Sequence, residues 1–332
     1  MITRIYYYTE EDSTDPFYNL AIEQHLLDLV PPNSCILYLW QNKNTVVIGK
    51  NQNCWKECKM QELADDGGSM VRRLSGGGAG YHDLGNLNFT FVTRKEDYDV
   101  SRQLDVILTA LNPLGIHAEK SGRNDLHVDG RKFSGNAFYD NGSRCFHHGT
   151  LMVDVEKEKL GKYLQVSPGK LSGKGVDSVQ ARVVNLKELK PDLTIAQLKN
   201  ALIQAMEIVY QCEIEEIDEF DLDEIEIAAH SLKFGSDQFR LGRRIPFTWE
   251  VEQRFDWGGI ELQCEVESGQ IKNALIYSDA LDNGLIEAMA SALQNCAFGS
   301  KPMTERLQQL SQSWGMRQEL LDVCRYLQEL NV

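Results

Sequence analysis

A glycine-rich segment, Arg72 to Asp83 (RRLSGGGAGYHD), constrains this chain more than any other part of its sequence. Three consecutive glycines are unfavourable in regular structure, so they are expected where the main chain needs unusual dihedral angles or approaches a ligand closely. Arg72 and Arg73 supply permanently charged donors before the glycines, and His82 supplies a titratable one after them. Glycines alone would indicate a bend between two strands. With these flanking residues the segment predicts an anion-binding turn.

The segment matches neither of the commonest phosphate-binding motifs. Tyr81 stands where GxGxxG needs its last glycine, and GxxxxGK[ST] finds no lysine here. Its longer form, RRLSGGGAGYHDLGNLNF, resembles the signature of lipoate-protein ligases, although Gly80 stands where such ligases usually carry a bulkier apolar residue. Further segments resemble the same family in the same order: TVVIGKNQNCWKEC (from Thr45), GRNDLHVDGRKFSGNAF (from Gly122), FHHGTLMVDV (from Phe146) and GKGVDSVQARVVNL (from Gly173).

The resemblance implies an α+β fold in two domains. Residues 1–245 would form a catalytic domain with a mixed β-sheet, of the biotin/lipoate ligase type. Residues 246–332 would form a smaller C-terminal α/β accessory domain, because the segment RFDWGGIEL (Arg254 to Leu262) is similar to that of two-domain lipoate ligases. The implied activity is ATP-dependent: lipoate is activated to lipoyl-AMP, and the lipoyl group then passes to a lysine of an acceptor protein.

A second segment can be interpreted from its geometry. Leu126 to Phe133 reads as a hairpin with a two-residue turn at Asp129-Gly130. The register would place Val128 opposite Arg131, His127 opposite Lys132, Leu126 opposite Phe133 and Asp125 opposite Ser134. One face would then gather Leu126, Val128 and Phe133, and the other Asp125, His127, Lys132 and Ser134. Gly122 and Gly135 bracket the polar face, which favours a site over a merely solvated hairpin.

Lys132 is the expected catalytic residue, because by resemblance it falls where lipoate ligases carry the lysine that contacts both substrates. A carboxylate must be activated before it can acylate an amine, and attack on the α-phosphate of ATP builds negative charge on the phosphoryl oxygens. A lysine can bridge the carboxylate and the α-phosphate as a compact positive charge. Mg²⁺ would shield the triphosphate. No metal ligand is assigned, although Asp125 is a candidate.

The resemblance also implies a set of residues that bind ATP or lipoyl-AMP: Arg72, Arg73, Ser75, Gly76, Gly77, Gly78, Ala79, Gly80, Tyr81, His82, Asn86, Asp125, Lys132, Ser134, His148 and Lys174.

Adjacent histidines on a strand point to opposite faces, so His147 and His148 cannot both serve one site without a bulge. The resemblance favours His148 near the ligand and His147 in packing. Lys170 and Lys174 lie in a Gly/Ser-rich loop, SPGKLSGKG, which is either a solvated loop or a cover over the nucleotide.

Three other functions remain open. An ATP-independent octanoyl or lipoyl transferase of the same fold would use a cysteine thioester, for which Cys145 is the candidate. A biotin ligase shares the catalytic fold, but its usual GRGRRG-type loop is absent from this sequence. A pure binding module would not need Lys132.

The composition of the chain limits which partners we expect it to bind and in which compartment we expect it to work. The formal charge of −15 would repel a polyanion, so nucleic acid is not expected to bind. No run approaches the roughly 20 apolar residues of a membrane-spanning helix, and the N-terminus lacks the pattern of a secretory signal. Eight scattered cysteines indicate reduced thiols, and the pair Cys54 and Cys58 is a weak metal signal. We expect a cytoplasmic monomer that acts on lipoyl domains of 2-oxoacid dehydrogenase subunits, the glycine-cleavage H protein, or both.

Hydrophobic periodicity predicts the main elements. An acidic run, residues 213–226, holds nine Asp or Glu among fourteen residues and is expected to be a solvated face or a linker. A tight turn is expected at 267–270, and two or three helices should end the chain. Helices are expected at 19–29, 101–114 and 194–210, the last with a capping box at Thr194 and Gln197. Strands are expected at 38–40, 45–48, 87–92, 150–155, 248–255, 260–266 and 271–277.

Overall fold

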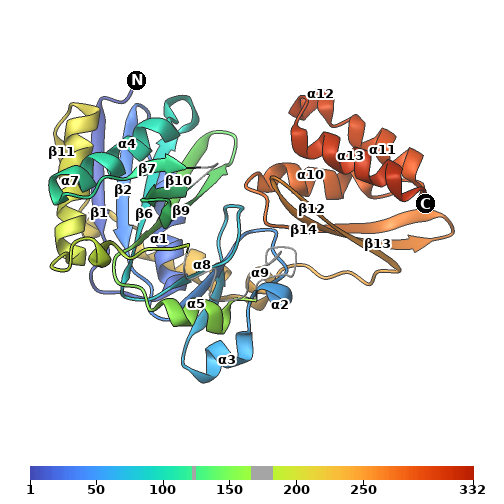
Figure 1. The fold of residues 1–332 in the computed structure, drawn as a ribbon. Coiled ribbons are helices and arrows are strands. Elements are labelled where there is room, and N and C mark those ends of the chain that lie inside the picture. The colour runs from blue at the N-terminus through green and yellow to red at the C-terminus, as the bar shows by residue number, and fades with distance from the viewer. Residues whose placement is uncertain (122–124, 166–181) are drawn as a thin grey trace. The chain divides into compact units, whose positions relative to one another are not determined.

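The structure is a computed structural model that describes residues 1–121, 125–165 and 182–332. Its residues group into two compact units. Unit 1 comprises Met1–Val47, Trp55–Arg73 and Gly80–Arg240, and unit 2 comprises Ile48–Cys54, Leu74–Ala79 and Leu241–Val332. Each unit is described by itself, and Figure 1 traces the elements of both.

Unit 1 is built on a mixed sheet, which confirms the expected fold class. In the described residues its strand order is β11-β1-β2-β6-β10-β9-β8-β7. β1 pairs in parallel with β2 and β11, whereas the other neighbours pair antiparallel. In chain order the strands are β1 (Arg4–Thr9), β2 (Ser34–Trp40), β6 (Asn86–Arg94), β7 (Glu119–Ser121), β8 (Asp125–Val128), β9 (Arg131–Asp140), β10 (Arg144–Met152) and β11 (Ile214–Glu216).

The two faces of this sheet differ in chemistry. Helices α4 (Val100–Leu111) and α7 (Ile195–Tyr210) pack on one face, where alternate residues such as Leu37, Phe89 and Phe91 form the main core (Figure 1). Helix α1 (Pro16–Leu29) lies on the other face and bonds to Tyr38 and Thr90. The face that α1 covers is therefore only partly apolar. Its buried polar side chains make it the face of the sheet that can form a binding site.

Shorter elements complete unit 1. A three-stranded sheet has the order β4-β3-β5, and the glycine-rich segment joins β4 to β5. The strands are β3 (Thr45–Ile48), β4 (Ser69–Arg72) and β5 (Gly80–His82), and the helices are α2 (Cys54–Glu57), α3 (Met60–Asp65), α5 (Lys157–Tyr163), α8 (Glu224–Gly235) and α9 (Asp237–Arg240). No helix in the described ranges has both the length and the apolarity to cross a membrane.

Unit 2 holds an antiparallel sheet of β12 (Trp249–Phe255), β13 (Gly258–Glu267) and β14 (Gln270–Ser278). Its core joins this sheet to the helices that follow it. The expected turn between β13 and β14 is confirmed: Ser268 and Gly269 have φ of 49° and 74°, as a type I′ turn requires. Four helices follow rather than two or three: α10 (Asn283–Leu293), α11 (Ser300–Gln308), the short α12 (Ser311–Trp314) and α13 (Gln318–Leu330).

Two predicted elements of unit 1 differ at their ends. The strand expected at 150–155 is part of β10, which begins at Arg144 and ends at Met152. It ends there because the N–H groups of Val153 and Asp154 both donate to the carbonyl of Gly85, at 2.9 and 2.8 Å, and so leave the ladder. The helix expected to reach Leu114 ends as an α-helix at Leu111 and continues as a 3₁₀ turn, because Pro113 has no N–H to donate.

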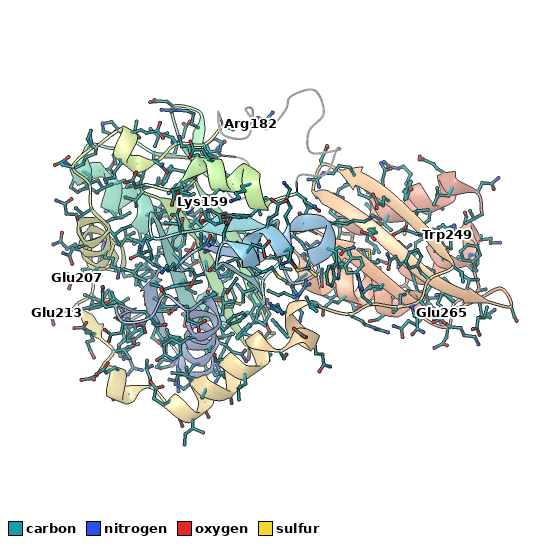
Figure 2. All side chains as sticks on the ribbon, turned by 90° about the horizontal axis from the view of Figure 1, so that it is seen from below. Lys159, Arg182, Glu207, Glu213, Trp249 and Glu265 are labelled. Carbon is teal, nitrogen blue, oxygen red and sulfur yellow. The ribbon has the colours of Figure 1, made fainter. Side chains whose placement is uncertain are left out.

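The acidic run is a solvated face, as expected, but it is not a linker. Ile214–Glu216 forms the edge strand β11, and the Asp223 side chain caps α8 by accepting from the N–H groups of Ile225 and Glu226. Figure 2 shows Glu207 and Glu213 at the outer edge of unit 1, where Glu207 also accepts from the N–H of Ile214. The run is ordered because its few apolar residues and its main chain engage α1, α7 and β1.

The expected hairpin is present, but its register is correct only beside the turn. Val128 pairs with Arg131 and His127 with Lys132, whereas Leu126 pairs with Ser134 and Asp125 with Gly135. The predicted pairs of Leu126 with Phe133 and of Asp125 with Ser134 are wrong, because a β-bulge adds one residue to β9. The predicted apolar face is correct, because Leu126, Val128 and Phe133 are buried in the main core. The predicted polar face is wrong for Ser134, which is fully buried and lies opposite Leu126 because of the same bulge.

This turn generates a stability prediction. Asp129 and Gly130 have φ of 50° and 72°. Gly130→Ala should lower the free energy of unfolding of unit 1 by about 1 to 2 kcal/mol, because alanine is strained at left-handed φ. Urea denaturation of the full chain measures the change.

Gly235→Ala is the matched control. Gly235 ends α8 at an ordinary φ, and a Cβ there would meet nothing within 4 Å. This variant should be neutral or stabilise by up to about 1 kcal/mol. Equal effects of the two substitutions would contradict the turn assignment.

Candidate active site

The two arginines before the glycine-rich loop have different hydrogen-bond partners. Arg72 is buried, and its Nε donates to the carbonyls of Phe239 and Arg240, both at 3.1 Å. Arg73 is also buried, and its Nη1 lies 3.4 Å from the carbonyl of Val47. Burial lowers the pKa of Arg73 to about 10, against the raising effect of the Glu23 carboxylate. Arg73 therefore keeps its positive charge at neutral pH in a poorly solvated place.

The glycines of the loop are required by close backbone packing within unit 2. Gly77 has φ of 86° and its N–H donates to the carbonyl of Ala280 at 2.9 Å. A Cβ on Gly76 would lie 2.4 Å from the Ala280 oxygen and 2.5 Å from that of Leu281. Ser75 is buried, Gly78 is exposed and Ala79 is half-buried. The amide of Gly77 can thus reach an anion only when it releases Ala280.

Strand β5 presents its residues alternately. Gly80 and His82 share one face, while Tyr81 turns its ring toward Tyr163 and donates its hydroxyl to Oδ1 of Asn44 at 3.0 Å. His82 is buried, with Nδ1 3.4 Å from Nδ2 of Asn42. Burial, aided by the charge of Arg73, lowers the pKa of His82 to about 3. His82 is therefore a neutral imidazole, not the cationic donor that its sequence position alone would allow.

The polar face of the hairpin brings Lys132 and Asp125 together. Nζ of Lys132 lies 2.7 Å from Oδ1 of Asp125, and both side chains are about one third exposed, at 37% and 29%. A Cβ on Gly135 would lie 2.9 Å from the same Nζ, so the absence of a side chain there leaves room for the ammonium group. His127 lies farther from Asp125, at 4.0 Å. Ser134 is buried and accepts from Nδ2 of Asn136 at 3.5 Å.

His147 and His148 point to opposite faces of β10, as expected. His147 is fully buried in the main core, between Oε1 of Gln103 at 3.1 Å and Oδ1 of Asn136 at 2.8 Å. Burial lowers its pKa to about 3. His148 faces α1, and its Nδ1 lies 2.7 Å from Oε1 of Glu23. Only His148 therefore lies on the face of the sheet that carries Glu23 and Thr90.

Glu23 is the residue that sequence reasoning missed. It is 1% exposed, and its Oε1 accepts from Oγ1 of Thr90 at 2.7 Å in addition to its contact with His148. Its charge also acts on Arg73. Asn19, one turn earlier on α1, is buried as well. A signal was available, since Asn19 and Glu23 are spaced i and i+4 within a run that is otherwise largely apolar.

The last of the predicted site residues are Asn86 and the two lysines of the Gly/Ser-rich loop. Asn86 is buried and donates to Oδ1 of Asn88 at 2.8 Å, beside the start of β6. Lys170 and Lys174 lie outside the described residues. All eight cysteines lie in described parts of the chain, and none of them forms a disulfide.

Comparison with known proteins matches both parts of the chain to the same kind of enzyme. The family model of the lipoyl protein ligase A/B catalytic domain matches residues 15–207, and that of the bacterial lipoate protein ligase C-terminus matches residues 244–327. Lipoate-protein ligase A of Psychrobacter cryohalolentis is 39% identical over 308 residues, which is 90% of this chain and 91% of that protein.

Solved structures agree in fold. The crystal structure of P. falciparum LipL1 in complex with lipoate is 29% identical, covers 98% of this chain and 99% of its own, and has a TM-score of 0.84. Lipoate-protein ligase A bound with ATP is 22% identical, covers 73% of this chain and 99% of its own, and has a TM-score of 0.60, a likeness that shows the fold. With matching family models over both parts and a relative that is 39% identical over 90% of this chain, the chain belongs to the lipoate-protein ligase family.

Proposed function

We propose that this ligase activates lipoate with ATP to form lipoyl-AMP and then transfers the lipoyl group to a lysine of a lipoyl-domain acceptor. The family membership supports the reaction, as do the solved structures of P. falciparum LipL1 in complex with lipoate and of lipoate-protein ligase A bound with ATP. The observation that carries the proposal in this chain is the Lys132 ammonium, on a side chain about one third exposed, which pairs with Asp125 in the room that Gly135 leaves. We assign the ATP and lipoyl-AMP contacts to the residue set given above, of which Lys174 lies outside the described residues.

The first step joins two anions, so charge neutralisation is its main requirement. A lipoate carboxylate oxygen attacks the α-phosphorus, the bond from that phosphorus to the bridging oxygen breaks, and pyrophosphate leaves with the electron pair. Lys132 suits this step because its ammonium can neutralise the carboxylate and the developing phosphoryl charge together. Arg73 keeps a second positive charge directly before the glycine-rich loop, in a place shielded from water.

Mg²⁺ would be held chiefly by the triphosphate, as is usual for this ion. Asp125 offers one carboxylate, although that group already pairs with Lys132. In the described ranges the acidic cluster that could hold an ion is Glu250, Glu252 and Glu261 of unit 2, which does not include Asp125. We therefore assign no protein cage to Mg²⁺.

The second step releases AMP when the ε-amine of the acceptor lysine attacks the acyl carbon. One structural relative, from Thermoplasma acidophilum, is described together with its E2 lipoyl domain. We propose lipoyl domains of 2-oxoacid dehydrogenase subunits, the glycine-cleavage H protein, or both as acceptors, and a monomeric enzyme.

The alternative is an acyl transferase that forms a thioester on Cys145. Its side chain is fully buried, and burial, with the Asp140 charge, raises the pKa of Cys145 to about 12. A thioester enzyme needs a thiolate near neutral pH, so this thiol is poorly suited to act as the nucleophile.

Lys132→Ala tests the proposed catalytic residue. It should lower kcat for lipoate-dependent ATP–pyrophosphate exchange by roughly 100- to 1,000-fold, by analogy with the loss of one preorganised donor to a developing anion. Lys95→Ala is the control, because Lys95 also pairs with an aspartate, Asp140 at 2.7 Å, but on an exposed surface. Exchange by Lys132→Ala at more than half the native rate would refute the assignment.

Cys145→Ser distinguishes a reaction through lipoyl-AMP from a reaction through a thioester on Cys145. ATP-dependent lipoylation should stay within about threefold of native, because a small change of a packing residue costs on the order of 1 kcal/mol or less. Mass spectrometry of the native enzyme after incubation with acyl donor should show no acyl group on Cys145. A trapped thioester together with loss of all activity in the variant would favour the transferase.

The proposed division into domains 1–245 and 246–332 can be tested by truncation. Residues 74–79 pack with residues 241–332, so a fragment that ends at Ile245 loses the partners of its glycine-rich loop. It should fail to make lipoyl-AMP but still transfer lipoyl from supplied lipoyl-AMP to an acceptor domain. Circular dichroism checks that the fragment is folded, and near-native adenylation by it would show that the accessory role is wrong.

A further inference from the structure

The main chain of Lys132 is bonded to a segment that lies outside the hairpin. Its N–H donates to the carbonyl of Arg182 at 2.8 Å, and its own carbonyl accepts from the N–H of Val184 at 2.9 Å. Together the two bonds form a parallel bridge between Lys132 and Val183. Both polar groups of the Lys132 main chain are therefore held by residues 182–184, of which Figure 2 labels Arg182.

The ladder between β9 and β10 ends before it comes to Lys132. Among the described residues its last pair is Asn136 with Gly149. Continued in the same register, the ladder would bring Val153 opposite Lys132, but the N–H of Val153 donates to the carbonyl of Gly85 instead. Residues 182–184 thus supply the partners that β10 does not, and a main-chain group left unpaired away from water is costly.

Asn185 fastens this segment to the chain that follows β10. Its Oδ1 accepts from the N–H of Val155 at 3.0 Å, and its Nδ2 donates to the carbonyl of the same residue at 2.9 Å. A main-chain N–H can only donate and a carbonyl can only accept, so these contacts also fix which end of the amide is nitrogen. Asn185 is only 8% exposed, so little water can compete for either bond.

The neighbours of Asn185 connect it to β9. Val184, which donates to Lys132, is fully buried in the main core. Oε1 of Glu188 accepts from the N–H of Asn185 at 2.8 Å, and its Oε2 lies 3.3 Å from Nη1 of Arg131. Asn185 is therefore linked both to Lys132 and to the residue before it.

The place of the Lys132 main chain matters because the side chain that it carries is long and flexible. Nζ must reach Asp125, 2.7 Å away, through the room that Gly135 leaves. A shift of the main chain moves the ammonium group out of this place, and a misplacement of about 1 Å can cost roughly 100-fold in rate.

We propose that Asn185 is a positioning residue for Lys132. By holding residues 182–184 against β9, it fixes the main chain of Lys132 and so the place of the ammonium group that neutralises charge in the first step. The role of Lys132 in that step rests on the proposed function, whereas the anchoring of its main chain does not. Asn185 needs no contact with a substrate for this role.

Amide hydrogen exchange tests the anchor without any activity. In the full chain, Asn185→Ala removes both bonds to Val155. The N–H of Lys132, followed by NMR, should then exchange about tenfold faster than in the native chain, the size expected when a buried hydrogen-bonded group is lost. An exchange rate equal to the native one would overturn the positioning role, even in an active ligase.

Asn141→Ala is the matched control. Oδ1 of Asn141 also bonds two main-chain groups, the N–H of Ser143 at 3.1 Å and that of Arg144 at 2.8 Å, but in the turn that follows the other end of β9. This variant should leave both the exchange of the Lys132 N–H and kcat within about twofold of native. Equal effects of the two substitutions would show a general loss of stability and overturn the proposal.

A double-mutant cycle tests whether Asn185 acts through Lys132. Asn185→Ala alone should lower kcat for lipoate-dependent ATP–pyrophosphate exchange by roughly 10- to 100-fold, with the KM for ATP within about threefold of native. Added to Lys132→Ala, it should lower kcat by no more than about threefold further, because the ammonium group that it positions is already gone. A residue that only supports folding would cost the same in both backgrounds, and that result would overturn the proposal.

Asn185→Asp replaces Asn185→Ala if the alanine variant does not fold. It keeps the acceptor for the N–H of Val155 and puts an oxygen in place of the donor to the Val155 carbonyl, so it breaks one bond at the same volume. Native kcat and native exchange at Lys132 in this variant would overturn the proposal. If the native chain shows no lipoate-dependent exchange of pyrophosphate, the proposed function is refuted, and the amide measurement still supports or overturns the anchor.

Discussion

One buried carboxylate, that of Glu23, organises the polar face of the main sheet. It accepts from Thr90 and contacts His148, both at 2.7 Å, and its charge offsets that of Arg73. Without it, Arg73 would be a buried cation without this compensation, which is far more costly than an exposed one. Asn19 lies one turn earlier on α1 and donates to Oδ1 of Asn42 at 3.0 Å, and Nδ2 of Asn42 lies 3.4 Å from Nδ1 of His82 on β5. A single helix thus fixes the groups on two separate strands, β5 and β10.

The glycine-rich loop satisfies two demands with the same residues. Its composition suggests a backbone that can approach an anion, and its structure shows a backbone that already approaches other carbonyls. A Cβ on Gly49 would lie only 2.1 Å from the oxygen of Gly77, and Gly76 leaves no room for a side chain beside Ala280. Because one amide hydrogen cannot serve two acceptors fully, the bond from Gly77 to Ala280 would compete with the proposed binding of an anion at that amide.

The sequence correctly predicted the elements that depend on interactions between residues close together in the chain. The capping box of Thr194 and Gln197 starts α7 where expected, and Asp129-Gly130 forms the expected turn. The bulge at Phe133 could not be predicted, because it depends on how that ring packs in a core assembled from distant strands. Glu23 was missed for a related reason: a charged residue in a helix usually faces solvent, and only the sheet opposite shows that this one does not.

The adjacent histidines of β10 show how one strand can serve packing and chemistry together. His147 is held by Gln103 and Asn136 and lies among aromatic rings, so it ties β10 to α4 and to β9. Asn136 follows Gly135, and a Cβ on Gly149 would strike both the Gly135 carbonyl and the Asn136 side chain. The core-facing histidine thus helps to set the spacing between β9 and β10 at the residue that leaves room for Lys132. Since a displacement of about 1 Å can cost roughly 100-fold in rate, we expect the packing of His147 to matter for the position of Lys132, the proposed catalytic residue.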